Sequence, residues 1–460
     1  MNRRILIVAA SLAAALGAGW IGSAYYFSQK TEHAYQSRLD ELLARSPGLT
    51  VAERRYERGL FSAHARIVIS LPQTAARDGS PAQVLQVVFD DQIRHGPFPG
   101  GPSLAAAQVR STVQLRLPSG SSRELTLLTA DTRFDFQNRF QSRLGMPAGQ
   151  WKSDSGDVEA RWSAMEGEAE GRADTLATRY RANWPEFVLR VVEAGNKGQL
   201  DLTLRTMASQ GHTDTLRSLW FAPGEVRSTL ASLHMVMKAP QAEAVDVELT
   251  GLSHEGRVTL NGELIDMRSG FNGQGRVGKT RLDRVEMVEH WRRLHAPTIE
   301  KLIEKVLGEL ATGTAVDPER QQAQLLASLK SLLPHDPEYQ LEKLSATIDG
   351  ETGTLSWQAG IQGAAADQAD NPLRLAGLAN ARIDLRLPQK WLALAASAGE
   401  ATASGLPAGA LEDMLAQGEQ MGFLKVADGV VSANANWVRG RLDVNGRTVF
   451  AMPGQQRPAR

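Results

Sequence analysis

The sequence lacks cysteine altogether in its 460 residues. This absence excludes disulfide frameworks, thiolate nucleophiles, iron–sulfur clusters and zinc sites with cysteine ligands. An excess of one charge is absent too, because 51 Lys and Arg balance 51 Asp and Glu. A nucleic-acid-binding protein would show a basic excess, so we expect no nucleic-acid partner. With 42% hydrophobic and 22% charged residues, the chain has a globular composition and enough length for two or three domains.

Long hydrophobic runs are scarce, and the sequence has only one of membrane-spanning length. Residues 5–27 carry no charge, follow Arg3 and Arg4, and end in aromatic residues. A run of this length predicts a single-pass transmembrane helix, and the two arginines favour a cytoplasmic N-terminus. We therefore expect an inner-membrane protein whose bulk is periplasmic, with the membrane itself as a partner. A cleaved signal peptide is the alternative, with Gly22-Ser23-Ala24 as its small-residue cleavage site.

Beyond this run, a two-residue periodicity dominates the chain. Residues such as Val245, Val247 and Leu249 alternate with polar neighbours, and Ile383 and Leu385 do the same near the C-terminus. Alternation gives a strand one apolar and one wet face, which is typical of antiparallel sheet. The predicted fold class is therefore α+β: an N-terminal transmembrane helix followed by a largely antiparallel, curved β-sheet region with an inserted helical segment.

Helical spacing interrupts this pattern in the last third of the sequence. Val288, Trp291 and Leu294 recur at a spacing of three residues and predict a helix over 284–310. Near the end, Asn445-Gly446 is a turn signal that predicts a closing hairpin. The expected organisation is a transmembrane anchor at 1–30, a juxtamembrane helix at 31–48, a β-rich periplasmic region at 49–283, a helical segment at 284–340, a second β-rich region with short helices at 341–452, and an unfolded tail at 453–460.

One segment matches a nucleotide-binding motif. Gly273, Gly278, Lys279 and Thr280 fit the phosphate-loop pattern G-x-x-x-x-G-K-[ST] over residues 273–280. In that motif, backbone N–H groups hold the phosphates, the lysine reaches the terminal phosphates and the threonine binds magnesium. The preceding segment is polar instead of a buried hydrophobic strand, so we favour an exposed β-strand here over a nucleotide site.

Asp90, Asp91 and His95 lie close together in the sequence. Carboxylates near a histidine can form an acid–base pair, so these three residues are candidates for an enzymatic site. Solvated residues at a strand end are the alternative interpretation. No spacing in the sequence is typical of a metal site, and we expect neither a metal nor another cofactor.

The order of several motifs resembles the YdgA family of bacterial envelope proteins of unknown function. The likeness lies in the N-terminal run, Tyr56 to Ser62 before a strand, His95 to Pro99, Gly275 to Asp283, and the closing hairpin at Asn445-Gly446-Arg447. The resemblance implies an inner-membrane protein with a periplasmic β-rich region and allows a homodimer, and it supplies no catalytic residues.

Together these features predict a protein with a structural, partner-binding or lipid-binding role in the bacterial envelope instead of an enzyme. A sheet with one apolar face offers a surface for acyl chains or for a partner protein. The alternatives are an envelope enzyme that uses Asp90, Asp91 and His95, or a nucleotide-binding protein that uses residues 273–280.

Overall fold

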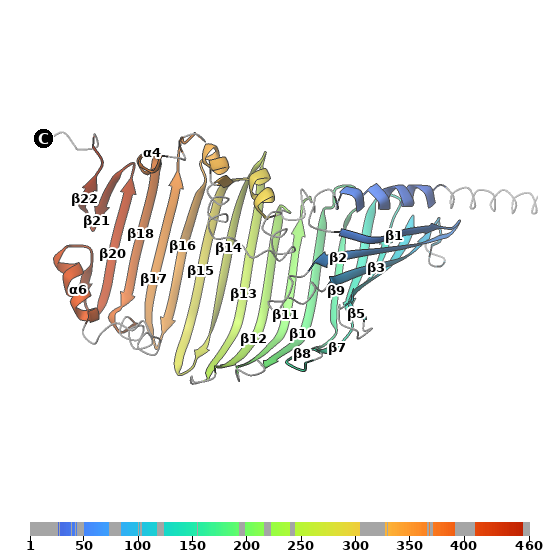
Figure 1. Ribbon diagram of the computed structural model, residues 1–460, viewed down its shortest axis with the longest axis horizontal. Coiled ribbons are helices and arrows are strands. Elements are labelled where there is room, and N and C mark those ends of the chain that lie inside the picture. The colour runs from blue at the N-terminus through green and yellow to red at the C-terminus, as the bar shows by residue number, and fades with distance from the viewer. Residues whose placement is uncertain are drawn as a thin grey trace, which may run out of the picture. The chain divides into compact units, whose positions relative to one another are not determined.

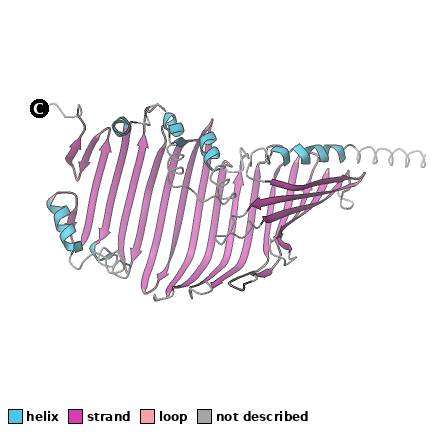
Figure 2. Ribbon diagram, in the orientation of Figure 1, coloured by secondary structure: helices cyan, strands magenta, loops and turns pink. Residues whose placement is uncertain are grey.

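The computed structural model is built almost entirely from antiparallel β-strands (Figure 2). It describes residues 26, 28–37, 39–41, 43, 50–72, 84–99, 101, 104–116, 124–153, 155–192, 198–215, 222–239, 244–303, 327–328, 330–365, 368, 371–391 and 410–453. These residues form an antiparallel sheet of 22 strands. The chain divides into two compact units, unit 1 at 1–190, 206–224 and 300–316, and unit 2 at 191–205, 225–299 and 317–460.

This architecture corrects the predicted fold class, localisation and membrane keywords. No helix among the described residues is long and apolar enough to cross a membrane. The helix-anchored α+β fold and the single-pass inner-membrane placement are therefore not supported. The run at residues 5–27, on which that prediction rested, lies outside the described residues except for Tyr26.

Unit 1 is a meander in which most consecutive strands pair antiparallel (Figure 1). β6 pairs with β9 and β9 with β10, while β7 and β8 form a hairpin between them in the sequence. Its strands are β1 (Thr50–Arg58), β2 (Ser62–Pro72), β3 (Val84–His95), β4 (Ala107–Arg116), β5 (Glu124–Phe134), β6 (Arg139–Met146), β7 (Gly149–Lys152), β8 (Val158–Trp162), β9 (Met165–Arg172) and β10 (Thr178–Val192).

The helix predicted after the apolar run is present and covers the first strands of unit 1. Residues 28–37 and 39–41 are helical. Leu39 is buried against Ile67 and Ile69 of β2, with Tyr35 and Leu43 packed beside it. The helical spacing of these apolar residues places them on one face, as the sequence predicts. Their burial against β2 and β3 forms the core of this unit.

Unit 2 continues the antiparallel pairing from β13 to β18 in sequence order (Figure 1). β18 then pairs with β20, which also pairs with β19 and β21, and β21 pairs with β22. Its strands are β12 (Gly224–Lys238), β13 (Val245–Asn261), β14 (Leu264–Val277), β15 (Thr280–His295), β16 (Glu338–Ile348), β17 (Glu351–Ile361), β18 (Ala379–Pro388), β19 (Lys425–Ala427), β20 (Val430–Val438), β21 (Arg441–Val444) and β22 (Arg447–Ala451). β11 (Gln199–Thr213) is divided, with residues 199–205 in unit 2 and residues 206–213 in unit 1.

Turn residues set the register of the hairpins in unit 2. Arg439 and Gly440 join β20 to β21, and Asn445 and Gly446 join β21 to β22; all four have positive φ, from 48° to 88°. Two-residue loops with positive φ at both positions match the right-handed twist of the flanking strands. The predicted closing hairpin is therefore confirmed.

The predicted helix over 284–310 is wrong at its start. Residues up to His295 belong to β15, and the helix begins only at Ala296 and is described as far as Ile303. Other short elements of the described residues are η1 (Leu333–His335), α4 (Pro372–Leu378) and α6 (Ala410–Gln420). α4 begins at Pro372 because the Asn371 side chain accepts hydrogen bonds from two backbone N–H groups of the first turn. Residues 454–460 of the predicted unfolded tail lie outside the described residues.

Candidate functional site

The cross-strand register of unit 2 gathers apolar side chains on one face of its sheet. Residues directly opposite each other on paired strands point to the same face. We call this surface the apolar face, and define it by three cross-strand rows. The first is Val258, Met267, Trp291, Tyr339, Ala359, Ala381, Trp437 and Leu442; the second is Gly256, Ser269, Glu289, Leu341, Trp357, Ile383, Ala435 and Val444; the third is His254, Phe271, Met287, Leu344, Leu355, Leu385 and Ala433.

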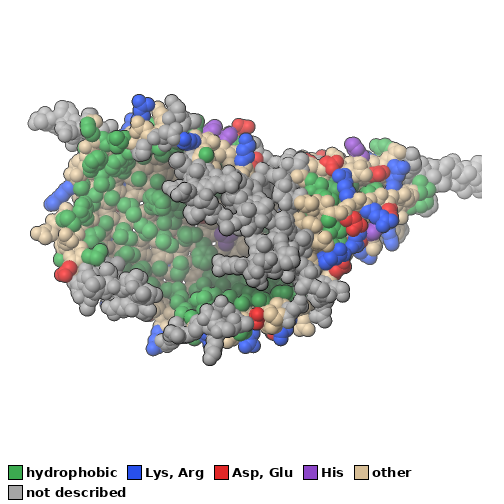
Figure 3. Space-filling view, viewed as in Figure 1, with side chains coloured by type: hydrophobic (Ala, Val, Ile, Leu, Met, Phe, Trp, Pro, Cys, Tyr) green, Lys and Arg blue, Asp and Glu red, His purple; other side chains and the backbone are tan. Residues whose placement is uncertain are grey.

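The apolar face is open to solvent over much of its extent. Large side chains near its middle stay exposed: 38% for Trp291, 44% for Trp357 and 40% for Ile383. At the usual strand spacing, the eight strands from β13 to β21 that carry the rows extend over roughly 34 Å. In the space-filling view hydrophobic side chains gather over β13 to β20, and most charged side chains lie around the rim (Figure 3).

The opposite face of the same strands is polar, and several of its charges are paired. The row adjacent to Trp291 and Glu289 runs through Arg268, His290, Gln340, Gln358 and Arg382. Arg268 bonds to Glu342 at 2.7 Å and Lys343 to Glu286 at 2.8 Å. The lysine holds the pKa of Glu286 below its usual range, and Arg268 does the same for the pKa of Glu342. The strands are therefore two-faced, as their alternation predicts.

Four polar side chains interrupt the apolar face. Tyr339 donates a hydrogen bond of 3.3 Å from its hydroxyl to Oε2 of Glu289. Ser269 lies opposite Glu289 on β14, and its Oγ is 3.2 Å from Nε2 of His254 on β13. Burial raises the pKa of the Tyr339 phenol, and the neighbouring Glu289 carboxylate raises it further. A polar strip thus crosses four strands of a surface that is otherwise apolar.

The ring of Tyr339 in this strip lies between two tryptophan rings. The Trp291 and Tyr339 ring centroids are 4.3 Å apart with an interplanar angle of 50°, and those of Tyr339 and Trp357 are 5.2 Å apart at 69°. Offset and edge-on arrangements of this kind are favourable for aromatic pairs. Because the rings are inclined to each other, they offer both faces and edges to a ligand. Glu289 and these rings form what we call the aromatic–carboxylate cluster.

The structure does not bring Asp90, Asp91 and His95 together. Asp90 and Asp91 are neighbours on β3 and therefore point to opposite faces of the sheet. Asp91 and His95 share a face, but four residues of strand separate them by about 13 Å, with Ile93 between them. An acid–base pair needs its groups within hydrogen-bond reach. The three side chains do not form such a pair.

Each of the three residues has partners of its own in unit 1. Asp90 lies 3.1 Å from Nε2 of His64 and 3.4 Å from Arg66. Asp91 is only 8% exposed and accepts a hydrogen bond of 2.7 Å from the Tyr35 hydroxyl of the covering helix. His95 is 2% exposed, and its Nε2 is 3.2 Å from the carbonyl oxygen of Gly59. Asp91 and His95 therefore belong to the core beneath the helix.

The phosphate-loop match at residues 273–280 forms a β-hairpin. Gly273 is part of β14, Thr280 opens β15, and Val277 pairs with Thr280 across the two-residue loop Gly278-Lys279. Gly278 has φ +57°, which the first position of such a turn requires. A phosphate loop instead leads into a helix whose N-terminus faces the phosphates. In this structure Gly273, Gly278, Lys279 and Thr280 lie in a strand, a turn and the next strand, and no helix follows directly after them.

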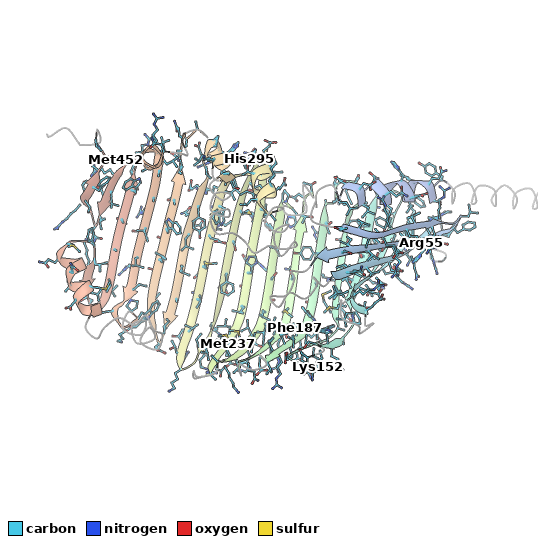
Figure 4. The ribbon with its side chains drawn as sticks, viewed as in Figure 1. Arg55, Lys152, Phe187, Met237, His295 and Met452 are labelled. Carbon is cyan, nitrogen blue, oxygen red and sulfur yellow. The ribbon has the colours of Figure 1, made fainter. Side chains whose placement is uncertain are left out.

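Two histidines meet at the end of β15. His295, labelled in Figure 4, lies at that end. Its ring stacks on His335 with ring centroids 4.1 Å apart, and its ring nitrogens lie near Thr298 and Glu263. Desolvation, with the nearby His295, lowers the pKa of His335. Among the residues with a described placement, no group of three or more His, Asp or Glu side chains is arranged to hold a metal ion.

Sequence reasoning missed the aromatic–carboxylate cluster. Glu289 and Trp291 lie on β15, whereas Tyr339 on β16 and Trp357 on β17 come 50 and 68 residues after Glu289. The sequence contains one signal of the cluster. Met287, Glu289 and Trp291 follow a two-residue periodicity, and Glu289 occupies a position where that periodicity predicts an apolar side chain. Only the strand register shows that the four residues are neighbours.

Comparison with known proteins gives one family match over nearly the whole chain. The model of the family described as bacterial protein of unknown function (DUF945) matches residues 1–450. Protein YdgA of Escherichia coli (strain K12) is 29% identical over 105 residues, which is 22% of this chain and 20% of the relative's length. The aligned part thus spans about a fifth of the curated relative. These matches confirm the resemblance to the YdgA family. No solved structure matches the chain.

Proposed function

The chain belongs to the DUF945 family of bacterial proteins of unknown function, and on that premise we propose that it binds the acyl chain of an amphiphile on the apolar face of unit 2. The observation that carries the proposal is the set of three cross-strand rows, in which Trp291, Trp357 and Ile383 remain 38 to 44% exposed. Large exposed apolar patches with a polar rim mark binding sites for ligands, partners or membranes.

The shape of the face suits an elongated ligand. Its rows run across the strands for roughly 34 Å, and within the third row Met287, Leu344, Leu355 and Leu385 follow one another without a charged residue. A hydrocarbon chain that lies along such a row removes its own apolar surface and that of the protein from water, and this burial favours binding. Burial stabilises the complex by about 0.8 kcal/mol for each methylene group, which corresponds to about a fourfold change in Kd.

The two-faced pattern makes the proposal specific to one side of the sheet. On β18, Ile383 belongs to the apolar face, whereas its neighbour Arg382 is on the polar face and pairs with Asp384 at 2.7 Å. A ligand on the apolar face contacts Ile383 and leaves Arg382 in water. The two residues therefore provide a matched pair for testing where a chain binds.

A chain-length series tests the proposal. Binding of octanol, decanol and dodecanol to the purified full-length protein is measured by isothermal titration calorimetry. We expect Kd to fall about fifteenfold for every two methylene groups. Ile383→Ser should weaken dodecanol binding, whereas Arg382→Ser should leave it unchanged. Affinity that does not depend on chain length, or equal losses in both variants, would contradict the proposal.

A second measurement looks for the natural occupant. The purified protein is extracted with organic solvent and the extract is analysed by mass spectrometry. We expect one class of acyl-chain amphiphile to be enriched over the same extraction of the Ile383→Ser variant. Equal amounts from both proteins would show that the lipid is carried along without using this face.

A further inference from the structure

We propose that the aromatic–carboxylate cluster binds a positively charged amine or quaternary ammonium group, so that the amphiphile on the apolar face carries a cationic nitrogen near the chain. This inference rests on the proposed function and names the chemistry of its headgroup. Four residues carry it: Glu289, Trp291, Tyr339 and Trp357.

Glu289 has no cationic partner in the part of the chain that the structure describes. Among the described residues its carboxylate is in no ion pair, and its one hydrogen bond comes from the neutral hydroxyl of Tyr339. The acidic residues of the opposite face nearest to it, Glu286 and Glu342, are paired with Lys343 and Arg268. A carboxylate held on an apolar surface without a cation is unfavourable unless a partner compensates its charge. A cationic ligand supplies that partner.

The second argument is the composition of the surroundings. The rings of Trp291, Tyr339 and Trp357 are in sequential contact, and both tryptophans are open to solvent. The negative face of an aromatic ring attracts a cation within about 6 Å of its centroid, and tryptophan does so most strongly. Quaternary ammonium groups are recognised by such clusters of rings, because they have no N–H to donate and a large polarisable surface. An anionic headgroup would meet repulsion from Glu289 and from the ring faces alike.

The third argument is the position of the cluster. Glu289 lies in the second row, with Leu341 opposite on β16 and Ser269 opposite on β14. His254, the other polar side chain of the strip, has its Nε2 3.2 Å from Ser269 Oγ, on the far side of Ser269 from Glu289. The carboxylate therefore has apolar rows on both sides of it. A headgroup at Glu289 leaves its chain free to follow Met287 and Leu344 along the third row.

The test compares three amphiphiles with the same twelve-carbon chain: dodecyltrimethylammonium, dodecyl maltoside and dodecyl sulfate. Each is titrated by calorimetry into the full-length protein below its micellar concentration. We expect the ammonium compound to bind about tenfold more tightly than the neutral maltoside, and the sulfate to bind more weakly than either. In Glu289→Gln the ratio of the ammonium affinity to the maltoside affinity should fall close to one.

Two further variants serve as controls. Glu286→Gln removes an equal charge from the opposite face of the same strand and should keep the preference. Trp357→Leu keeps an apolar side chain but removes a ring, and should lower the preference for the ammonium compound without abolishing chain binding. The melting temperature and circular dichroism of each variant establish that it is folded.

The outcomes separate this inference from the proposed function. If all three amphiphiles bind equally and affinity still rises with chain length, acyl-chain binding stands and the ammonium site is wrong. If Glu289→Gln keeps the wild-type preference, the cluster is again wrong as the site. If no amphiphile binds, the proposed function fails and the inference fails with it.

Discussion

The hydroxyl of Tyr339 donates a 3.3 Å hydrogen bond to Oε2 of Glu289 across the β15–β16 pairing, on a face that is otherwise apolar. The two residues are 50 positions apart in the sequence. The Glu289 carboxylate is partly shielded from water, and its hydrogen-bond donor is the neutral Tyr339 hydroxyl instead of a cation. The pair therefore holds the Glu289 carboxylate in position while its charge stays uncompensated within the described residues.

The coupling between these two residues predicts a change in the titration of Tyr339. Burial raises the pKa of Tyr339 first, and the charge and hydrogen bond of Glu289 raise it further. Replacing Glu289 by Gln removes the charge but not the burial. We expect the pKa of Tyr339 to fall in Glu289→Gln and yet remain above the ordinary tyrosine value. Alkaline titration with 13C-labelled tyrosine measures it by NMR, and an unchanged pKa would show that the two side chains are not coupled.

A pair of tyrosines in unit 1 predicts opposite effects of the same substitution. The Tyr35 hydroxyl donates a hydrogen bond of 2.7 Å to the buried Asp91 carboxylate. The buried Tyr56 hydroxyl has no hydrogen-bond partner among the described residues. Their rings are 5.6 Å apart. Tyr35→Phe leaves a buried carboxylate without its donor and should lower the free energy of unfolding by about 2 kcal/mol. Tyr56→Phe removes an unsatisfied hydroxyl and should leave stability unchanged or raise it slightly.

Urea denaturation of both variants checks this contrast. Equal destabilisation by the two substitutions would mean that ring packing, not the Asp91 hydrogen bond, decides the effect. The tyrosines also give an alkaline limit to the stability of unit 1. Burial raises the pKa of Tyr56 to about 12, and burial together with Asp91 raises the pKa of Tyr35. Since both folded-state values lie above the unfolded value near 10, their contribution is intact below pH 10 and is lost as pH rises above it.

Substitutions in the phosphate-loop match should change the stability of the protein, and we expect no binding of nucleotide there. A Cβ at Gly275 would overlap the backbone of Glu248 and Leu249 on β13, and one at Gly273 would overlap the Leu252 side chain. We expect Gly275→Ala to lower the free energy of unfolding by about 1–3 kcal/mol. Lys279 lies in an exposed turn, so Lys279→Ala should change stability by less than about 0.5 kcal/mol.

Thermal melts with and without magnesium ATP complete that experiment. We expect no nucleotide-dependent shift in melting temperature for the wild type. A shift that disappears in Lys279→Ala would instead restore the nucleotide-binding interpretation of residues 273–280.

Much of the strand content follows from the sequence, and the error over residues 284–295 has a local cause. Met287, Glu289 and Trp291 alternate as a strand should, but Arg293 has φ +54° and the register shifts between Trp291 and Leu294. This irregularity returns Leu294 to the apolar side three residues after Trp291 instead of at an even spacing. The resulting spacing of three is typical of a helix and produced the incorrect helix over 284–295.

The candidate site was harder to predict than the strands because it depends on register. Asp90 and Asp91 are adjacent in sequence, but a strand sends neighbours to opposite faces, so their proximity in the chain does not bring them together in space. Glu289 and Trp357 are distant in the chain and come onto the same row through two strand pairings, β15–β16 and β16–β17, with Leu341 between them. Periodicity assigns a residue to a face; it leaves open which residues of that face are neighbours.

The burial of His95 predicts an acid-sensitive step in stability. Its side chain is 2% exposed, Nε2 is placed to donate to the Gly59 carbonyl oxygen at 3.2 Å, and Nδ1 has no partner among the described residues. Protonation would put a positive charge into this buried site. Burial accordingly lowers the pKa of His95, an effect that interactions with the backbone of Gly59 and Leu60 partly offset.

The sign of the pH dependence follows from this lowered pKa. Below about pH 6.5 the unfolded chain binds a proton at this histidine more readily than the folded chain does, so acid favours unfolding. The contribution of neutral His95 is intact above pH 6.5 and is lost as pH falls, at up to about 1.4 kcal/mol per pH unit. Urea denaturation at pH 7.5 and pH 5.0 should show a smaller difference between the two pH values in His95→Gln than in the wild type. Glutamine keeps a donor for Gly59 and takes up no proton, so an identical difference in both proteins would show that His95 is not the group that titrates.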